Sequence, residues 1–314
     1  MKNNTNEIYD ILIIGVGPAG MTAAIYAARA MAKIAMIEKG APGGKVTKTS
    51  EIENYPGFDS ILGPDLAYKM FEQTQKLQIP YLGEKIIEVK KEPATNLFEL
   101  VTLSEKSYYA RAVIVATGTV ERKIGIPGEL DLYGMGVSYC AVCDGALFKN
   151  KDVAVVGGGY AALEEAMYLT KFANKVYLIH RRNQFRADKN VVEKAKNNPK
   201  IEFVFDTIST EIKGVDSKKV NGLVVKNVKT NAVQELAVSG VFPYIGSIPI
   251  TQFLEQMDVL DENNYVIVDS KGATKVPGLF AAGDVTNTTL RQIATAVSDG
   301  SKAGQFAVEY LDNL

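Results

Sequence analysis

Cys140 and Cys143 are the only cysteines in this 314-residue chain, and two residues separate them. On the first turn of a helix, this spacing places both sulfur atoms on one side, close enough to form a disulfide. The partial positive charge of a helix N-terminus also favours thiolate over thiol. The sequence therefore predicts a reversible, redox-active dithiol at this position.

Three structural roles compete with the redox role of the pair. A zinc site needs about four ligands, and because His180 is the only histidine, carboxylates would have to supply the other two. A stabilising disulfide across two residues would close too short a loop to constrain the unfolded chain much. A pair of inert buried thiols is the third alternative. No metal site is predicted.

Asp144 directly follows Cys143 and is the candidate acid–base group. A carboxyl group beside a thiolate is expected to have a raised pKa, and it could then carry the proton released by thiol–disulfide exchange. The alternative is that Asp144 is a helix-capping or first-turn acid that only stabilises the helix.

The N-terminal segment is predicted to form a strand, a glycine turn, a helix and a second strand. The apolar run at 9–14 is typical of a buried parallel strand, and Gly15-Val16-Gly17-Pro18-Ala19-Gly20 follows it. A helix is predicted over 21–31, and a strand over 33–37 ends at Glu38. Glycines let backbone N–H groups approach a pyrophosphate, and an acid 18 residues beyond Gly20 can accept hydrogen bonds from both ribose hydroxyls.

A second copy of this pattern lies downstream. A strand is predicted over 152–156, Gly157-Gly158-Gly159-Tyr160-Ala161-Ala162 opens a helix over 163–172, and a strand over 175–179 ends at His180. Gly157, Gly159, Ala162 and His180 follow Gly15, Gly17, Gly20 and Glu38 by 142 residues each. This constant offset predicts two nucleotide-binding domains built alike.

The two copies differ at the residue that decides nucleotide specificity. Glu38 suits a nucleotide with a free ribose, such as FAD, because a carboxylate would repel a 2′-phosphate. His180 is followed by Arg181, Arg182 and Arg186, whose guanidinium groups suit NADP(H) over NAD(H). The alternative for the arginines is a solvated loop. His180 is expected to contact the nucleotide or to pack, rather than to act as a catalytic base.

These patterns predict an α/β fold with two Rossmann-like, three-layer nucleotide-binding domains. A strand at 109–117 runs into Gly118, and an apolar run ending at Gly283-Asp284 precedes a helix that starts near Gln292. Asp284 could bind the ribityl chain or pyrophosphate of a flavin. We expect a discontinuous FAD-binding domain over 1–116 and 247–314. An NADPH-binding domain over 117–246, which carries the cysteine pair, is expected to be inserted in it.

The composition is that of an ordinary soluble globular protein, with 23% charged and 46% hydrophobic residues. A net charge of −1 without a basic stripe indicates no nucleic-acid partner. The uncharged run at 11–28 is long enough to suggest a membrane span, but it contains the glycines and proline of the first turn. Glu7 and Asp10 argue against a signal peptide. We expect a cytoplasmic protein with no membrane partner.

The motifs together resemble those of low-molecular-weight, bacterial-type thioredoxin reductases, and the resemblance covers nearly the whole chain. It also rests on Gly40 to Gly44, Glu53-Asn54-Tyr55-Pro56-Gly57, Glu164-Glu165-Ala166 and Arg291-Gln292. The resemblance implies FAD in the first domain, NADPH in the second, a homodimer, and oxidised thioredoxin as the substrate. It further implies that Cys143 faces the flavin and that Cys140 exchanges with thioredoxin.

The resemblance and the two glycine motifs give a set of expected cofactor contacts. For FAD they are Gly15, Gly17, Pro18, Ala19, Gly20, Glu38, Lys39, Gly43, Gly44, Lys45, Asn54, Thr117, Gly118, Gly283, Asp284, Arg291, Gln292 and Ile293. For NADPH they are Gly157, Gly159, Tyr160, Ala161, Ala162, Glu165, His180, Arg181, Arg182 and Arg186. Lys45 and Tyr160 depart from the family pattern, and Phe242-Pro243-Tyr244 and Ile250 are also unusual near the second crossing between the domains. Lys45 replaces a usual Gln and could stabilise an anionic reduced flavin or contact the pyrophosphate, and Tyr160 replaces a smaller polar residue.

The expected reaction passes a hydride from NADPH to FAD and then two electrons to the Cys140–Cys143 disulfide. Cys140 then attacks the disulfide of thioredoxin, and Cys143 resolves the mixed disulfide. In this family, nicotinamide and dithiol take turns at the flavin by rotation of the second domain. The rivals are a flavin reductase or oxidase of the same fold that uses ferredoxin or oxygen, and a redox-sensing nucleotide-binding protein. Continuous NADPH consumption with thioredoxin would separate a reductase from a sensor.

Overall fold

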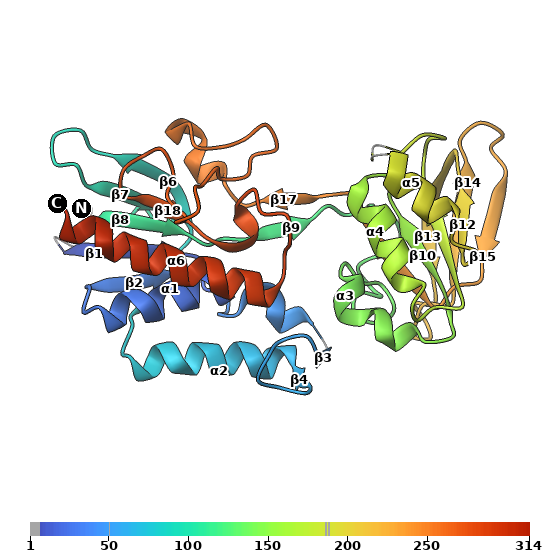
Figure 1. The fold of residues 1–314 in the computed structure, drawn as a ribbon, viewed down its shortest axis with the longest axis horizontal. Helices are drawn as coiled ribbons and strands as arrows, with labels where there is room; N and C mark the ends of the chain where they lie inside the picture. The colour runs from blue at the N-terminus through green and yellow to red at the C-terminus, as the bar shows by residue number, and fades with distance from the viewer. Residues whose placement is uncertain (1–6, 50, 186, 188) are drawn as a thin grey trace. The chain divides into compact units, whose positions relative to one another are not determined.

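The computed structural model describes residues 7–49, 51–185, 187 and 189–314, and it divides into two compact units (Figure 1). Unit 1 comprises Met1–Val120 and Ile248–Leu314, and unit 2 is Glu121–Ser247. From the sequence, the chain is expected to pass from one domain to the other after residues 116 and 246. In the structure it passes from one unit to the other after Val120 and Ser247. One compact unit is thus inserted in another.

Unit 1 is built on a seven-stranded sheet of order β5-β2-β1-β8-β7-β6, in which β18 also pairs with β8. The strands are β1 (Ile8–Ile14), β2 (Ile34–Ile37), β5 (Tyr81–Leu82), β6 (Ile86–Lys91), β7 (Phe98–Thr102), β8 (Ser107–Val115) and β18 (Leu279–Ala281). The strands β5, β2, β1, β8 and β18 run parallel, whereas β6 and β7 run antiparallel to their neighbours.

The parallel strands of unit 1 are buried on both faces, as their apolar sequences predict. Along β1, Ile11 and Ile13 belong to one buried cluster, and Leu12 and Ile14 belong to another on the opposite face. The first cluster is completed by helices α1 (Pro18–Arg29) and α6 (Ile293–Asp312), and the second by β6, β7 and the 3-10 helix η3 (Gln252–Met257). The parallel strands therefore form the middle one of three layers, and β6 and β7 of the same sheet form part of the third layer.

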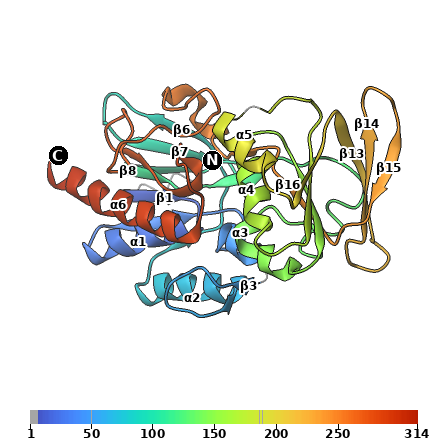
Figure 2. The same cartoon turned by 45° about the vertical axis from the view of Figure 1, so that its right-hand side comes forward.

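Helices α1 and α6 lie side by side (Figures 1 and 2). Glycines make this close approach possible, because a Cβ at Gly300 or Gly304 would collide with the backbone of Ala19 or Ala23. Helix α2 (Gly63–Lys76) and the 3-10 helices η1 (Gly44–Lys48) and η4 (Gly283–Val285) complete unit 1, with the small sheet β3 (Glu51–Ile52) and β4 (Ile61–Leu62).

Unit 2 holds a four-stranded parallel sheet of order β12-β11-β10-β16 and an antiparallel sheet of order β13-β14-β15. The strands are β10 (Asp152–Val156), β11 (Lys175–Ile179), β12 (Ile201–Val204), β13 (Thr207–Lys213), β14 (Gly222–Asn227), β15 (Val233–Leu236) and β16 (Gly240–Pro243). The helices are α3 (Ala141–Asp144), η2 (Gly145–Phe148), α4 (Tyr160–Leu169) and α5 (Lys189–Lys196).

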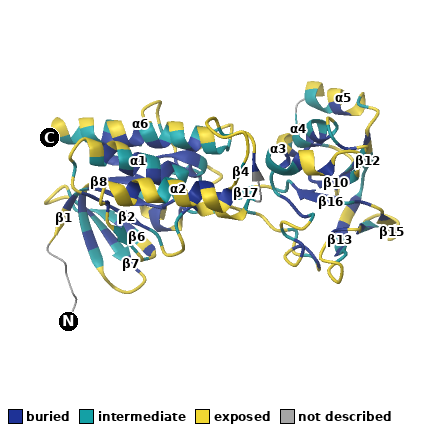
Figure 3. Cartoon of the chain, turned by 90° about the horizontal axis from the view of Figure 1, so that it is seen from below, coloured by how far each residue is buried: buried dark blue, intermediate teal, exposed yellow. Residues whose placement is uncertain are grey.

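The parallel sheet is also the middle layer of unit 2. Val153 and Val155 pack toward α4 and α5, whereas Ala154 and Val156 pack toward the antiparallel sheet. Figure 3 shows the parallel strands of both units as mainly buried, with exposed residues on the outer faces of the helices. The α/β class predicted from the sequence is confirmed, and the order β2-β1-β8 in unit 1 corresponds to β11-β10-β16 in unit 2.

The strands that precede the two glycine motifs, β1 and β10, have nearly the predicted bounds. The helices that follow the motifs begin earlier than predicted. Helix α1 starts at Pro18 instead of residue 21, and α4 starts at Tyr160 instead of residue 163. Gly17 and Gly159 are the extended N-cap residues. The last residues of each glycine motif therefore form the first helical turn, and in α1 the fixed backbone of Pro18 suits that position.

Candidate functional site

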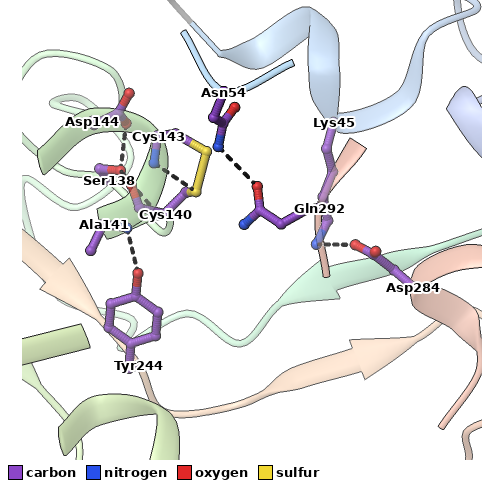
Figure 4. The surroundings of a disulfide bond; sticks show 10 residues. All are labelled: Lys45, Asn54, Ser138, Cys140, Ala141, Cys143, Asp144, Tyr244, Asp284 and Gln292. Atoms are coloured by element: carbon purple, nitrogen blue, oxygen red, sulfur yellow. Dashed lines mark hydrogen bonds and ion pairs between the residues drawn. A yellow bond between two sulfur atoms is a disulfide. The ribbon is translucent and has the colours of Figure 1, made fainter. Parts of the chain in front are cut away.

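Cys140 and Cys143 form a disulfide, with their Cα atoms 5.3 Å apart (Figure 4). Cys140 is the extended N-cap residue of α3, and its Sγ accepts the backbone N–H of Cys143 at 3.2 Å. The prediction that this spacing brings both sulfurs together is confirmed. Cys140 also has a hydrogen-bond donor directed at its sulfur, which favours a thiolate there after reduction.

Asp144 lies at the end of the same helical turn, where Ser138 holds it. The Ser138 hydroxyl donates to Asp144 Oδ2 at 2.5 Å and accepts the Cys140 N–H at 3.1 Å (Figure 4). Asp144 Oδ1 is buried and has no hydrogen-bond partner among the described residues. Burial raises the pKa of Asp144, and the Ser138 hydrogen bond only partly opposes it. This agrees with the raised pKa expected from the sequence, although burial is the main cause.

Behind the dithiol lies Tyr244, a residue whose partner the sequence did not indicate. Its hydroxyl oxygen accepts the Ala141 N–H at 2.6 Å (Figure 4). Burial raises the pKa of Tyr244, and the nearby carboxyl groups of Glu165 and Asp144 raise it further. Burial, together with the neighbouring Glu164, raises the pKa of Glu165 to about 7.

A second buried carboxylate, Glu129, holds the residue before Cys140. The Tyr139 hydroxyl donates to Glu129 Oε1 at 2.6 Å, and the N–H groups of Ile124 and Gly125 donate to its two oxygens at 2.9 and 2.7 Å. The ammonium of Lys123 lies 4.2 Å from the Tyr139 ring centroid. Sequence reasoning missed this anchor because an acid in a loop gives no signal of burial.

In unit 1, the turn after β1 leaves open space at the N-terminus of α1. A Cβ at Gly15 would collide with Ala116, and one at Gly20 would collide with the Gly15 carbonyl. Apart from its two chain neighbours, no described residue has a heavy atom within 4 Å of the place where a Cβ of Gly17 would be. The turn is therefore closed on its inner side and open where a pyrophosphate would approach the helix N-terminus, so these residues fit a dinucleotide.

Two further loops of unit 1 approach the same helix N-terminus. A Cβ at Gly44 would lie 3.4 Å from Gly17 Cα, and one at Gly283 would lie 2.9 Å from Ala19 Cβ. Gly43, Gly44, Gly118 and Gly283 all have positive φ, which allows the chain to turn sharply at these points. The predicted Gly-Gly and Gly-Asp motifs therefore lie together at the start of α1.

Lys45 joins these two loops. Its Nζ lies 3.8 Å from Asp284 Oδ2 (Figure 4). The same Nζ donates to Thr119 Oγ1 at 2.7 Å. Arg291 also reaches the second loop, since its Nε donates to the Asp284 carbonyl at 3.5 Å. The unexpected lysine is thus part of the cluster predicted to hold the flavin.

The other expected FAD contacts of unit 1 lie at strand and helix ends. Glu38 follows β2, and its Oε1 accepts the Gly40 N–H at 3.2 Å, while Lys39 is exposed. Asn54 donates to the side-chain oxygen of Gln292, the N-cap residue of α6, at 3.2 Å, and Ile293 is the first helical residue. The Thr117 hydroxyl donates to the Ile250 carbonyl at 2.7 Å.

In unit 2, the turn after β10 repeats the open and closed sides of the first turn. A Cβ at Gly157 would collide with the Tyr244 carbonyl. At Gly159, only the two chain neighbours among the residues that the structure describes come within 4 Å of the Cβ position. Tyr160 and Ala161 are exposed and Ala162 is buried. The larger tyrosine therefore points away from the core, and the residues at this turn fit a second dinucleotide.

His180 is a packing residue. A Cβ at Gly158 would collide with its ring, Nε2 lies 3.0 Å from the Gln184 carbonyl oxygen, and the ring stacks on Phe185 with centroids 5.3 Å apart. Arg181 and Arg182 follow it and are exposed. Arg186, the third arginine of the expected phosphate-binding group, lies outside the described residues.

Within the described residues, no group of three or more His, Cys, Asp and Glu side chains could hold a metal ion. In the same part of the chain, no helix has the length and apolar character that a membrane span requires.

The family model of pyridine nucleotide-disulphide oxidoreductases matches residues 9–300 of the chain. A thioredoxin reductase of Listeria monocytogenes is 46% identical over 308 residues, which are 98% of this chain and 95% of the relative. One of Bacillus subtilis is 46% identical over 310 residues, with 98% and 96% covered. The crystal structure of a Streptococcus pyogenes thioredoxin reductase has a TM-score of 0.92 at 46% identity, and the match covers 99% of this chain and 100% of that one.

Proposed function

This chain belongs to the pyridine nucleotide-disulphide oxidoreductase family and is an NADPH-dependent thioredoxin-disulfide reductase that uses FAD, and we propose how its residues divide the reaction. The observation that carries the proposal is the disulfide of Cys140 and Cys143 beside a buried carboxyl group with a raised pKa. Bound FAD supplies the two-electron relay between NADPH and this disulfide.

Unit 1 holds the FAD. The open side of the glycine turn at Gly17 supports binding of the pyrophosphate. In this proposal Glu38 accepts hydrogen bonds from the ribose hydroxyls, and Asp284 binds the ribityl chain or the pyrophosphate. Lys45 beside Asp284 places a cation in this cluster. The remaining FAD contacts are the residues that the sequence motifs predicted.

Unit 2 holds the NADPH. The open side of the turn at Gly159 supports binding of its pyrophosphate, and the exposed guanidinium groups of Arg181 and Arg182 are available to a 2′-phosphate. His180 contributes through packing beneath the turn. Arginine at these positions favours NADPH over NADH.

The dithiol and its neighbours carry out the exchange with thioredoxin. After reduction, the Cys143 N–H stabilises a thiolate on Cys140, which attacks one sulfur of the thioredoxin disulfide. Cys143 then attacks Cys140 Sγ in the mixed disulfide and releases the reduced thioredoxin. Asp144 receives and returns the proton at these sulfurs, since its raised pKa makes it a better proton acceptor than an ordinary carboxylate. We also propose a cytoplasmic homodimer, on the resemblance to the family.

An anaerobic absorbance experiment tests this division. The enzyme is mixed with NADPH or with NADH, the flavin absorbance is followed, and oxidised thioredoxin is then added. We expect fast bleaching by NADPH, slow bleaching by NADH, recovery with thioredoxin, and no recovery for Cys143→Ser. Exchange of both Arg181 and Arg182 for alanine should raise the KM for NADPH and leave that for NADH unchanged. Equal use of both nucleotides by the unaltered enzyme would refute the assignment of the arginines.

A further inference from the structure

Tyr244 connects the nucleotide turn of unit 2 with the helix that carries the cysteines. Its N–H donates to the Val156 carbonyl at 2.7 Å, and its own carbonyl closes the inner side of the turn at Gly157. Its hydroxyl oxygen accepts the Ala141 N–H at 2.6 Å, between the two cysteines in sequence. The residue is thus fixed at its backbone by the sheet and at its hydroxyl by the dithiol helix.

The hydroxyl of Tyr244 has one proton to donate, and the carboxyl groups of Glu165 and Asp144 both act on it electrostatically. A phenol can accept hydrogen bonds and donate one. Glu165 has the larger electrostatic effect on this hydroxyl, and Asp144 has a smaller one. Within the described part of the chain, Glu165 Oε2 and Asp144 Oδ1 are buried without a hydrogen-bond partner. One donor therefore lies among two carboxyl groups that each have an unused buried oxygen.

Three elements of unit 2 supply this cluster. Glu165 is on α4, Asp144 is on α3, and Tyr244 directly follows β16. Helix α3 packs against α4, and a Cβ at Gly145 would lie 3.3 Å from Leu169. The charged group that acts on Glu165 is Glu164, another carboxylate, so the surroundings of Glu165 favour its protonated form.

We propose that Tyr244 is a positioning residue for the dithiol helix and that Glu165 gains and loses a proton as the Cys140–Cys143 pair changes its oxidation state. This inference rests on the proposed role of the pair. Reduction breaks the Sγ–Sγ bond, two electrons from NADPH enter the two sulfurs, and two protons balance them. One proton makes a thiol; when the other sulfur stays a thiolate, Glu165 holds the second proton. Asp144 moves the proton at the sulfur itself.

A thiol–disulfide equilibrium tests the proton-holding role without NADPH. The FAD-loaded enzyme is equilibrated with reduced and oxidised dithiothreitol between about pH 6 and 8.5, and its free thiols are counted after alkylation. A thiolate raises the pKa of Glu165, so Glu165 takes up a proton on reduction, and its contribution to the equilibrium constant for reduction by dithiothreitol falls as pH rises. We expect Glu165 to add a fall of about threefold to tenfold in the equilibrium constant for reduction of the disulfide across neutral pH, since one proton contributes at most tenfold per pH unit.

Matched variants separate this role from a structural one. In Glu165→Gln, the equilibrium constant for reduction should no longer show the additional fall with pH. In Glu164→Gln, which changes the exposed neighbouring glutamate, the fall should remain. Tyr244→Phe should also lose it, because the coupling passes through the hydroxyl. An infrared difference spectrum of reduced minus oxidised enzyme should show a protonated carboxyl band that Glu165→Gln removes.

Superimposable pH profiles for the unaltered enzyme and Glu165→Gln would overturn the proposal, as would an unchanged infrared band. A profile that Tyr244→Phe leaves intact would overturn the role of Tyr244. Because dithiothreitol replaces NADPH and thioredoxin, these outcomes are independent of whether the enzyme turns over with its proposed substrates.

Discussion

Exchange of Ser138 for alanine should weaken unit 2 and alter the reactivity of the cysteines. The Ser138 side chain is buried, donates to the Asp144 carboxyl at 2.5 Å and accepts the Cys140 N–H at 3.1 Å. A hydrogen bond to a charged group contributes about 1.5–3 kcal/mol, and one between neutral groups about 0.5–1.5 kcal/mol. Their loss should lower the free energy of unfolding by about 2–4 kcal/mol.

The chain offers a matched control for this variant. Ser209 is also a buried serine of unit 2, but its hydroxyl has no partner among the described residues, so Ser209→Ala should cost little. Denaturant unfolding of the three proteins, followed by circular dichroism, measures the difference. A double-mutant cycle of Ser138→Ala with Asp144→Asn isolates the pairwise contribution.

The pH dependence of the same variants has a definite sign. The Ser138 hydrogen bond lowers the pKa of Asp144, so its removal raises that pKa further and penalises the charged carboxylate. The stability deficit of Ser138→Ala should therefore be larger above the raised pKa of Asp144 than below it. Equal stability of Ser138→Ala and Ser209→Ala, or an additive cycle with Asp144→Asn, would refute the reasoning.

Three further predictions follow from single contacts. Gly158→Ala should displace the His180 ring and lower the unfolding free energy by about 1–3 kcal/mol, whereas Gly159→Ala should leave stability unchanged and raise the Kd for NADPH, as calorimetry would measure. Glu129→Gln should cost about 1–3 kcal/mol in denaturant unfolding, because one of two backbone N–H groups loses its acceptor. Lys45→Gln should change stability by less than about 1 kcal/mol and lower the reduction midpoint of the bound flavin in a dye titration, since a cation is removed from its site. An unchanged midpoint would mean that this lysine does not face the flavin.

The backbone frame could be predicted from the sequence because its signals are local. Apolar runs of strand length, glycines at fixed offsets and an acid after the second strand identify β1, β2, β10 and β11 with little error. The constant offset between the two copies added a long-range relation that no single motif contains. Helix starts were less accurate, because a glycine motif ends inside the first helical turn.

The side-chain partners around the dithiol could not be predicted. Tyr244 stands in an apolar strand end, and nothing in its neighbours indicates that its hydroxyl meets the Ala141 N–H. Glu129 resembles any loop acid in sequence, yet it is 1% exposed. The Tyr244–Ala141 contact joins segments 103 residues apart, so it depends on the packing of unit 2. The Glu129 contacts lie within 10 residues of it in the chain, but they depend on the path of an irregular loop that no periodic pattern indicates. The raised pKa of Asp144 was predicted from its neighbours, but burial is the main cause.

The two chain segments that connect unit 1 with unit 2 determine how the two units could be separated into independent proteins. These two segments, β9 (Thr119–Glu121) and β17 (Ser247–Pro249), pair with each other. On the unit 1 side the Ile250 N–H donates to the Gly118 carbonyl at 3.1 Å, and on the unit 2 side the Arg122 N–H donates to the Gly246 carbonyl at 3.0 Å.

In each unit, the two chain ends at the crossing are therefore joined by a backbone hydrogen bond within that unit. A short turn in place of the insert would close unit 1 into a continuous chain, and residues 121–247 begin and end at neighbouring points. Unit 2 is an insertion whose two ends lie next to each other. Another redox domain with neighbouring ends could therefore replace it without a change in the backbone path of unit 1.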